Sequence, residues 1–318
     1  MKSLRCLGIV LILSILVVPV LFVELSAEFS VQEASVPQWF TVEGLVEKRL
    51  NLTYAELEEF PQVSEVTTLQ CVGGGQGGPK VTYNWTGVPL FYILSKAKVI
   101  SGPYRKVVFN ATDGFSSSVT LQTAMEPTTL LGLKANGTDL EHVSGLANGH
   151  KVVLPCRWGY KWVKWIRKIT VVDYDYKGTY ESLGNSDEAL RPNCTMPVTN
   201  PPIRDFTASN LENYTVRVLS DSSIESFSFE QDKRLIFNVE RKPGANGYFY
   251  VNLPEQLIGN PYIVFVDQNP TEFAQIESGG NTYIFFNYSD SSQTIAIEGT
   301  PKASDNGGGG IMQRSVLV

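Results

Sequence analysis

Hydrophobic and polar positions switch between strand-like and helix-like spacing over residues 37–177. Phe40–Val46 alternates as a strand does, whereas Thr53 and Glu56 form a capping box that predicts a short helix ending at Pro61. Because helices and strands interleave without a strict βαβ rhythm, the pattern predicts an α+β fold for residues 36–180. The other predicted elements are a helix over 88–97 and strands over 63–71, 106–110, 151–154 and 165–173.

The pattern changes to short strands alone in the second half of the chain. Turn residues separate seven alternating segments between residues 205 and 300, which predicts an all-β antiparallel sandwich domain. Residues 181–204 are rich in Asn, Ser, Pro and Gly and are predicted to be a linker. Residues 301–318 contain four consecutive glycines and are predicted to be a flexible tail. The seven segments are 215–219, 224–229, 234–239, 247–253, 262–266, 283–288 and 294–297.

Residues 1–27 have the pattern of a targeting segment. Lys2 and Arg5 precede an apolar run that ends at Val23, and the small residues Ser26 and Ala27 follow it. The run suits a cleaved signal peptide or an N-terminal anchor, and both readings remain open. Either one predicts an exported protein, with membrane association if the anchor is kept. Seven N-glycosylation sequons agree with export, at Asn51, Asn84, Asn110, Asn136, Asn193, Asn213 and Asn287.

Composition excludes several classes of function. The length of 318 residues suggests about two domains. Hydrophobic residues make up 43% of the chain, which is enough for a folded core, and the net charge of −6 argues against nucleic acid as a partner. With two histidines, His142 and His150, the chain offers little for a multi-histidine metal site. The four cysteines form no CxxC pair, which argues against a zinc ribbon or a two-cysteine redox motif.

The strongest candidate for chemistry is Cys71, which ends a predicted strand and precedes a run rich in glycine. Glycines such as Gly73 and Gly74 let the backbone approach a bulky ligand and offer N–H groups to anions. No Gly-Lys-[Ser/Thr] follows, so the loop is not a P-loop. A cysteine here suits a metal ligand or a nucleophile, and the alternatives are a buried structural cysteine or half of a disulfide.

A second candidate combines cations with tryptophans between residues 154 and 168. Arg157, Lys161 and Lys164 alternate with Trp158, Trp162 and Trp165, a mixture that is able to bind a phosphate and a stacked ring system. The alternative is that the aromatic residues pack inward and the cations are solvated. Cys156, in the same stretch, is predicted to pair with Cys194 across the linker and to leave Cys71 free. A bond between Cys71 and Cys156 is the competing arrangement and would argue against a metal site.

Several motifs in a fixed order resemble the molybdopterin-binding domain of the sulfite oxidase family. They run from Phe40-Thr-Val-Glu-Gly through the strand ending at Cys71, Trp85-Thr-Gly-Val-Pro-Leu-Phe, Asp113-Gly-Phe and Leu154-Pro to Gly159-Tyr-Lys-Trp-Val-Lys164. The resemblance implies a sulfite-oxidase-type fold over residues 37–177. It also implies that Cys71 binds molybdenum through its thiolate and that the segment from Gly159 to Lys164 holds the pterin and its phosphate. A single soft thiolate ligand leaves a coordination position open for oxygen transfer.

The predicted function is therefore an exported molybdopterin-dependent oxidoreductase that performs two-electron oxygen-atom transfer. The sequence contains no CxxCH motif for haem c, so a separate redox partner is expected to carry the electrons. The alternative is a cofactor-free binding or cell-surface module on the same fold. The second domain resembles β-sandwich modules of exported archaeal surface proteins, carried by Ile224-Glu-Ser-Phe-Ser-Phe and Gly247-Tyr-Phe-Tyr-Val. That resemblance implies an accessory role at a surface.

Overall fold

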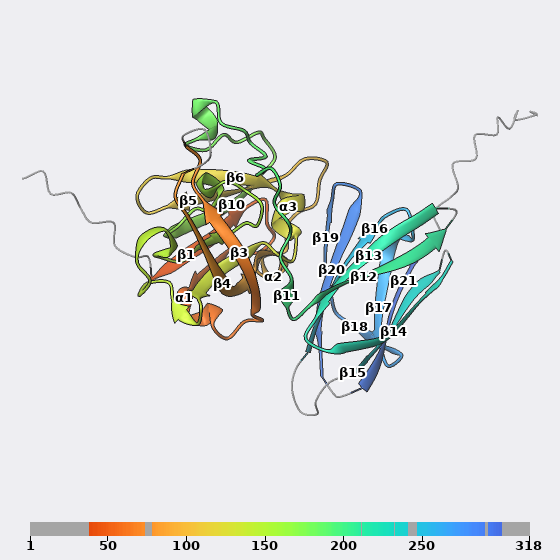
Figure 1. Ribbon diagram of the computed structural model, residues 1–318. Helices are drawn as coiled ribbons and strands as arrows, with labels where there is room; N and C mark the ends of the chain where they lie inside the picture. Colours follow the sequence, from red (N-terminus) through yellow and green to blue (C-terminus); the bar gives the residue numbers. More distant parts are fainter. Residues whose placement is uncertain are drawn as a thin grey trace, which may run out of the picture. The chain divides into compact units, whose positions relative to one another are not determined.

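The computed structural model describes residues 38–73, 78–210, 212–231, 233–240, 247–289 and 292–300. The predicted targeting segment and the predicted tail lie outside these ranges. The described chain is mostly β-sheet, with four sheets and three short α-helices (Figure 1). No helix within the described ranges has the length and apolar character needed to cross a membrane.

The first sheet joins strands from both ends of the predicted cofactor-binding region. Its order is β2-β1-β10-β5-β6, and β1 pairs with β10 in parallel while the other pairs are antiparallel. The strands predicted at 40–46, 106–110 and 165–173 are all present. The bounds are β1 Trp39–Gly44, β2 Leu50–Thr53, β5 Lys106–Ala111, β6 Ser116–Thr120 and β10 Ile166–Val172.

The second sheet carries the strand that leads to Cys71. Its order is β11-β3-β4-β7-β8, with β9 paired to β7. The long antiparallel pair β3 and β4 fixes both ends of the glycine-rich loop, because Gln70 is the register partner of Lys80. The bounds are β3 Val63–Gln70, β4 Lys80–Pro89, β7 Leu130–Ala135, β8 Thr138–Asp139, β9 Lys151–Val153 and β11 Thr199–Asn200.

The helices are shorter than the interleaved pattern suggested. Helix α1 (Tyr54–Leu57) starts at the predicted capping box, in which Thr53 and Glu56 satisfy each other's backbone N–H groups. It ends at Leu57, short of Pro61, and is a single turn. Helix α2 (Leu90–Ala97) is buried along almost its whole length, and α3 is Leu121–Met125. Because the helices contribute so little, sheet packing forms most of the core.

The second half of the chain consists of two five-stranded antiparallel sheets. Their orders are β12-β13-β16-β20-β19 and β14-β15-β21-β17-β18. Buried apolar residues of both sheets form one cluster. All seven predicted strands are present. Strands β12, β18 and β19 were missed, and β12 begins inside the predicted linker. The bounds are β12 Ile203–Asn210, β13 Glu212–Ser220, β14 Ser223–Glu230, β15 Arg234–Glu240, β16 Gly247–Pro254, β17 Gly259–Val266, β18 Asn269–Thr271, β19 Ala274–Ser278, β20 Asn281–Tyr288 and β21 Ser292–Thr300.

One carboxyl group in β3 lies on the buried face of the strand. Buried and less buried residues alternate along β3, and Glu65 occupies a position where its neighbours on the same face are Val63 and Thr67. Its side chain is 1% exposed, and neither carboxyl oxygen has a hydrogen-bond partner among the described residues. Burial raises the pKa of Glu65 to about 9, so the group is protonated at neutral pH.

We predict that the Glu65→Gln variant gains stability relative to the wild type as the pH rises. The folded state keeps its proton up to about pH 9, whereas the unfolded chain releases it near the ordinary glutamate pKa, so unfolding is favoured with rising pH between these values. The difference in unfolding free energy between variant and wild type should grow by up to about 1.4 kcal/mol per pH unit in this window. Denaturant titrations at pH 5, 7 and 8.5 measure it, with exposed Glu59→Gln as the control. A difference that does not change with pH would contradict the prediction.

Candidate functional site

Cys71 follows directly after β3 at the base of the glycine-rich loop. Its amide donates to the carbonyl of Pro79 (3.0 Å), and the amide of Gly78 donates to the Cys71 carbonyl (2.8 Å). A Cβ atom at position 78 would lie 3.1 Å from Cβ of Cys71, so glycine lets the returning chain pack closely against the cysteine. The thiol is free and the residue is half-buried. Gly73 is exposed at the start of the loop, and Gly74 lies outside the described residues.

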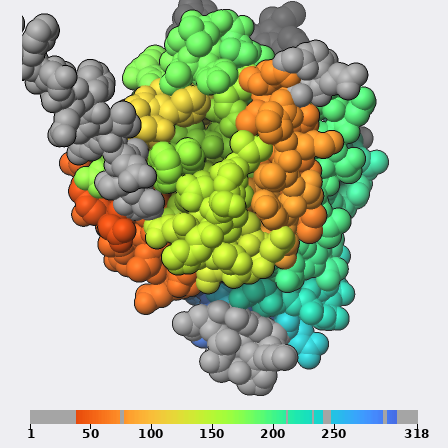
Figure 2. Space-filling view, turned by 60° about the vertical axis from the view of Figure 1, so that its left-hand side comes forward, coloured from red at the N-terminus to blue at the C-terminus, as the bar shows by residue number. Residues whose placement is uncertain are grey.

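Cys71 lines a cavity of about 290 Å³. A hollow opens on the face shown in Figure 2, between segments coloured orange, yellow and green. The walls are mainly aromatic and aliphatic, with two lysines and one carboxylate among the described lining residues. These residues are Leu69, Cys71, Val72, Asp113, Phe115, Gly145, Leu146, Lys151, Gly159, Tyr160, Trp162, Val163, Lys164 and Tyr180.

The predicted pterin-holding segment lies beside the cysteine because of one close backbone contact. Gly159 opens the short 3₁₀ helix η2 (Gly159–Lys161), and a Cβ atom there would lie 2.9 Å from the carbonyl oxygen of Gln70. Only glycine allows this approach without moving the backbone that precedes Cys71. The contact therefore joins two stretches that are almost 90 residues apart in sequence into one site.

One indole N–H in the same wall has no acceptor among the residues that the structure describes. Trp162 lines the cavity and packs edge-on against Trp85, with ring centroids 5.3 Å apart. Its Nε1 is buried and lacks a hydrogen-bond partner among the described residues. A buried donor without a partner costs free energy, so a polar ligand atom in the cavity would stabilise this arrangement.

Lys151 lines the cavity as well and was missed by the sequence reasoning. It is 1% exposed, and its Nζ donates to the carbonyl oxygen of Leu146 (2.7 Å). The ion pairs found among the described residues do not include Lys151. Burial lowers its pKa to about 7, repulsion from Lys164 adds to the effect and Cys71 opposes it. The sequence signal that could have identified it is a lysine at the start of the apolar run Lys151-Val-Val-Leu, because both faces of the strand β9 are buried.

The structure brings Lys164 to the cavity but takes the other two predicted cations elsewhere. Lys161 is 1% exposed, and its Nζ contacts Oε1 of Glu181 at 2.6 Å and Oδ1 of Asp187 at 3.1 Å. Arg157 pairs with Glu188, with Nη1 and Oε2 2.9 Å apart. Neither residue lines the cavity. The structure therefore places Lys161 and Arg157, which the sequence predicted to hold the cofactor, away from the cavity lining: both side chains contact carboxylates of the predicted linker.

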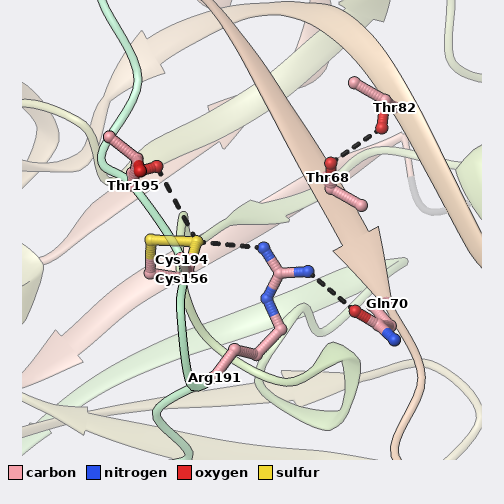
Figure 3. Close-up of a disulfide and its surroundings, with 7 residues drawn as sticks. All are labelled: Thr68, Gln70, Thr82, Cys156, Arg191, Cys194 and Thr195. Atoms are coloured by element: carbon pink, nitrogen blue, oxygen red, sulfur yellow. Dashed lines mark hydrogen bonds between the residues drawn. A yellow bond between two sulfur atoms is a disulfide. The ribbon is translucent and has the colours of Figure 1, made fainter. Parts of the chain in front are cut away.

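Cys156 and Cys194 form a disulfide, with Cα atoms 5.4 Å apart (Figure 3). Arg191, three residues before Cys194, donates from Nη1 to Oε1 of Gln70 (3.0 Å) and from Nη2 to Sγ of Cys194 (3.1 Å). The disulfide thus lies next to the residue that precedes Cys71, and it leaves the thiol of Cys71 free.

The donor set is suited to a metal held largely by a non-protein group. The described residues contain no cluster of three or more His, Cys, Asp or Glu side chains able to hold a metal ion. A single thiol, two lysines and an unpaired indole N–H instead suit an anionic organic cofactor whose metal takes one protein sulfur. The residues present therefore fit the group that the sequence motifs predicted.

Comparison with known proteins gives matches over the same region. Residues 29–180 match the family model described as oxidoreductase molybdopterin binding domain. The chain is 32% identical over 184 residues to nitrate reductase [NADPH] from Neurospora crassa, covering 48% of this chain and 18% of that protein. It is 33% identical over 140 residues to the putative protein-methionine-sulfoxide reductase subunit YedZ1 from Azospira oryzae, covering 44% and 50%. The chain thus spans half or less of the length of these relatives.

A solved structure, the sulfane dehydrogenase SoxCD from Paracoccus pantotrophus, matches with a TM-score of 0.40 and 19% identity, covering 81% of this chain and 66% of that one. The family match itself agrees with the ordered motifs and with the donor set around Cys71, and the cofactor that it indicates is molybdopterin. Residues 29–180 of this chain belong to the family of oxidoreductase molybdopterin binding domains.

Proposed function

We propose that this chain is a molybdopterin-dependent oxidoreductase in which Cys71 binds the molybdenum. The observation that carries the proposal is a free thiol lining a cavity that is also lined by a buried lysine, which has no carboxylate partner among the described residues. The bound cofactor supplies two-electron oxygen-atom transfer, chemistry that protein side chains do not provide. The proposal includes this oxygen-atom transfer reaction and a separate redox partner that carries the electrons.

The residues around the cavity have separate tasks in this proposal. Lys151 and Lys164 bind the anionic part of the cofactor, and the charge of an anion beside Lys151 restores the protonation that burial disfavours. Trp162 donates its unpaired N–H. Gly159 packs against the end of β3 at Gln70, so the hydrogen-bond donors that follow it and Cys71 keep a fixed spacing.

We further propose the domain organisation and location that the sequence suggested. Residues 36–180 would form an α+β domain of the sulfite oxidase type, and residues 205–300 a separate sandwich domain with an accessory role at a surface. The Cys156–Cys194 disulfide supports export, because such bonds persist in oxidising compartments. An N-terminal signal peptide or anchor, with membrane association if the segment is kept, and an external redox partner complete the proposal.

Cys71→Ser is predicted to abolish molybdenum binding without unfolding the protein. Purified from a host that makes the cofactor, the wild type should contain about one molybdenum per chain, and the variant less than about a tenth of that, because serine lacks the soft sulfur donor. Elemental analysis with circular dichroism measures both properties. Thr68→Ser, on the same strand, should keep its metal. A folded wild type without molybdenum would instead support a cofactor-free module.

Lys151→Gln is predicted to weaken retention of the cofactor. The variant removes a buried positive charge that has no acidic partner among the described residues, so the apoprotein should be as stable as the wild type or more stable. The holoprotein should lose molybdenum about tenfold faster during dialysis. Lys80→Gln, an exposed lysine near the other end of the loop, is the control. If both variants retained molybdenum equally well, Lys151 would not bind the cofactor.

Lys161→Met is predicted to act on stability instead of cofactor content. It leaves the carboxylate of Glu181, whose side chain is 0% exposed, without its cation, and such losses cost about 3–5 kcal/mol. Urea unfolding measures the change, while molybdenum per folded chain should remain near the wild-type value. Lys98→Met, which breaks an exposed pair with Glu47, should cost less than about 1 kcal/mol. Loss of molybdenum from folded Lys161→Met would return Lys161 to the cofactor site.

A further inference from the structure

An arginine from outside the family match contacts the residue that precedes Cys71. The match ends at residue 180, and the arginine is Arg191. Its guanidinium donates from Nη1 to Oε1 of Gln70 (3.0 Å) and from Nη2 to Sγ of Cys194 (3.1 Å) (Figure 3). The ion pairs found among the described residues do not include Arg191. The role of this cation therefore lies in its two hydrogen bonds and not in neutralising an acid.

Backbone hydrogen bonds bring Arg191 to the end of β3. The amide of Trp158 donates to the carbonyl oxygen of Ala189 (2.8 Å), and the amide of Arg191 donates to the carbonyl oxygen of Cys156 (2.9 Å). These bonds join the two stretches as a short antiparallel bridge. The arginine is thus carried by the stretch that also leads into Gly159, the residue packed against Gln70.

The disulfide closes this arrangement covalently. It joins Cys156, at one end of the bridge, to Cys194, three residues after Arg191, across a sequence separation of 38 residues. Cys156 has a φ of 59°, in the left-handed region that residues other than glycine seldom adopt, so its neighbours and not its own preference hold it there. The closed loop contains both Arg191 and the segment from Gly159 to Lys164, so the disulfide restricts the motion of both.

Gln70 is held through its backbone as well as its side chain. Its carbonyl oxygen packs against Gly159, where a Cβ atom would lie 2.9 Å away, and its Oε1 accepts from Arg191. The planar peptide group that joins Gln70 to Cys71 contains this carbonyl and the Cys71 N–H, which donates to the carbonyl oxygen of Pro79 (3.0 Å). A planar group fixed on both sides sets the direction in which the Cys71 side chain leaves the strand.

We propose that Arg191 is a positioning residue for Cys71, which acts through Gln70 and is itself held by the Cys156–Cys194 disulfide. The inference rests on the proposed function and adds to it a dependence on residues outside the matched region. Arg191 does not line the cavity, so it keeps the thiol in the direction that binds molybdenum without contacting the cofactor. Loss of Arg191 or of the disulfide should therefore loosen the metal ligand while the other donors of the cavity stay in place.

The first test measures molybdenum retention during dialysis of the loaded protein. Arg191→Gln should lose molybdenum about tenfold faster than the wild type, because glutamine is too short to reach both acceptors. The double variant Cys156→Ser/Cys194→Ser should lose it at a similar rate. Combining Arg191→Gln with either the disulfide variant or Gln70→Ala should add less than about twofold, since all these changes act on one contact.

The second test uses the apoprotein and does not depend on the cofactor. Iodoacetamide alkylates the half-buried Cys71, and mass spectrometry of its peptide gives the rate. Arg191→Gln and the disulfide variant should each raise this rate about fivefold through local opening of the strand end. Val171→Ala, a buried core position that does not line the cavity, controls for general loss of stability and should lower the Tm without changing the rate.

Arg204→Gln, an exposed arginine on β12, is the matched control for the charge change. Arg191→Gln with the retention and alkylation rate of Arg204→Gln would overturn the inference and leave the proposed function standing. Equal acceleration of alkylation by Val171→Ala would overturn it too, because the effect would then be one of overall stability. A folded wild type without molybdenum would overturn the proposed function and Arg191's role in metal binding, whereas faster alkylation in Arg191→Gln would still support its role in positioning the thiol.

Discussion

A buried ammonium group has to find acceptors, and this requirement organises the site. Lys161 and Lys106 are each 1% exposed, and an unpaired charge at such depth would cost several kcal/mol. Both lysines contact Asp187, and Lys161 also contacts Glu181. These acids lie in the predicted linker, so pairing the charges forces that segment to fold against the strands. The position of Tyr180 beside the cavity follows from this pairing.

Lys151 is buried to the same extent as Lys161 and Lys106 but is not paired with an acid among the described residues. It too is 1% exposed, but its Nζ contacts a carbonyl oxygen and the ring of Trp85 and no carboxylate among the described residues, and burial lowers its pKa to about 7. The protein neutralises Lys161 internally and leaves Lys151 with unused hydrogen-bonding capacity next to Cys71. Two lysines ten residues apart therefore differ in their surroundings: Lys161 is paired with acids of the predicted linker, and Lys151 is the one that the proposed function assigns to the cofactor.

The sequence predicted those features that depend on local pattern. Alternation located β3 to within one residue of its end at Gln70, and the capping box located the start of α1, because both signals depend on neighbouring residues. The direction of a lysine side chain depends on distant partners instead. The cation-rich stretch gave no indication that Lys161 would turn toward Glu181, whose role is visible only when the linker is seen folded.

The composition of the predicted linker does not reveal that this segment is held against the rest of the protein. Its Asn, Ser, Pro and Gly content is typical of a flexible connection, yet a disulfide, buried ion pairs and the Arg191–Gln70 hydrogen bond hold it against the cofactor-binding region. These ties involve few residues and leave no periodic pattern. The family match ends at residue 180, so Glu181, Asp187 and Cys194 lie outside the matched residues, whereas all described lining residues of the cavity lie within them. The contacts that hold the end of the matched region in place therefore come from residues that the match does not describe, and the match alone does not transfer a substrate from one protein to another.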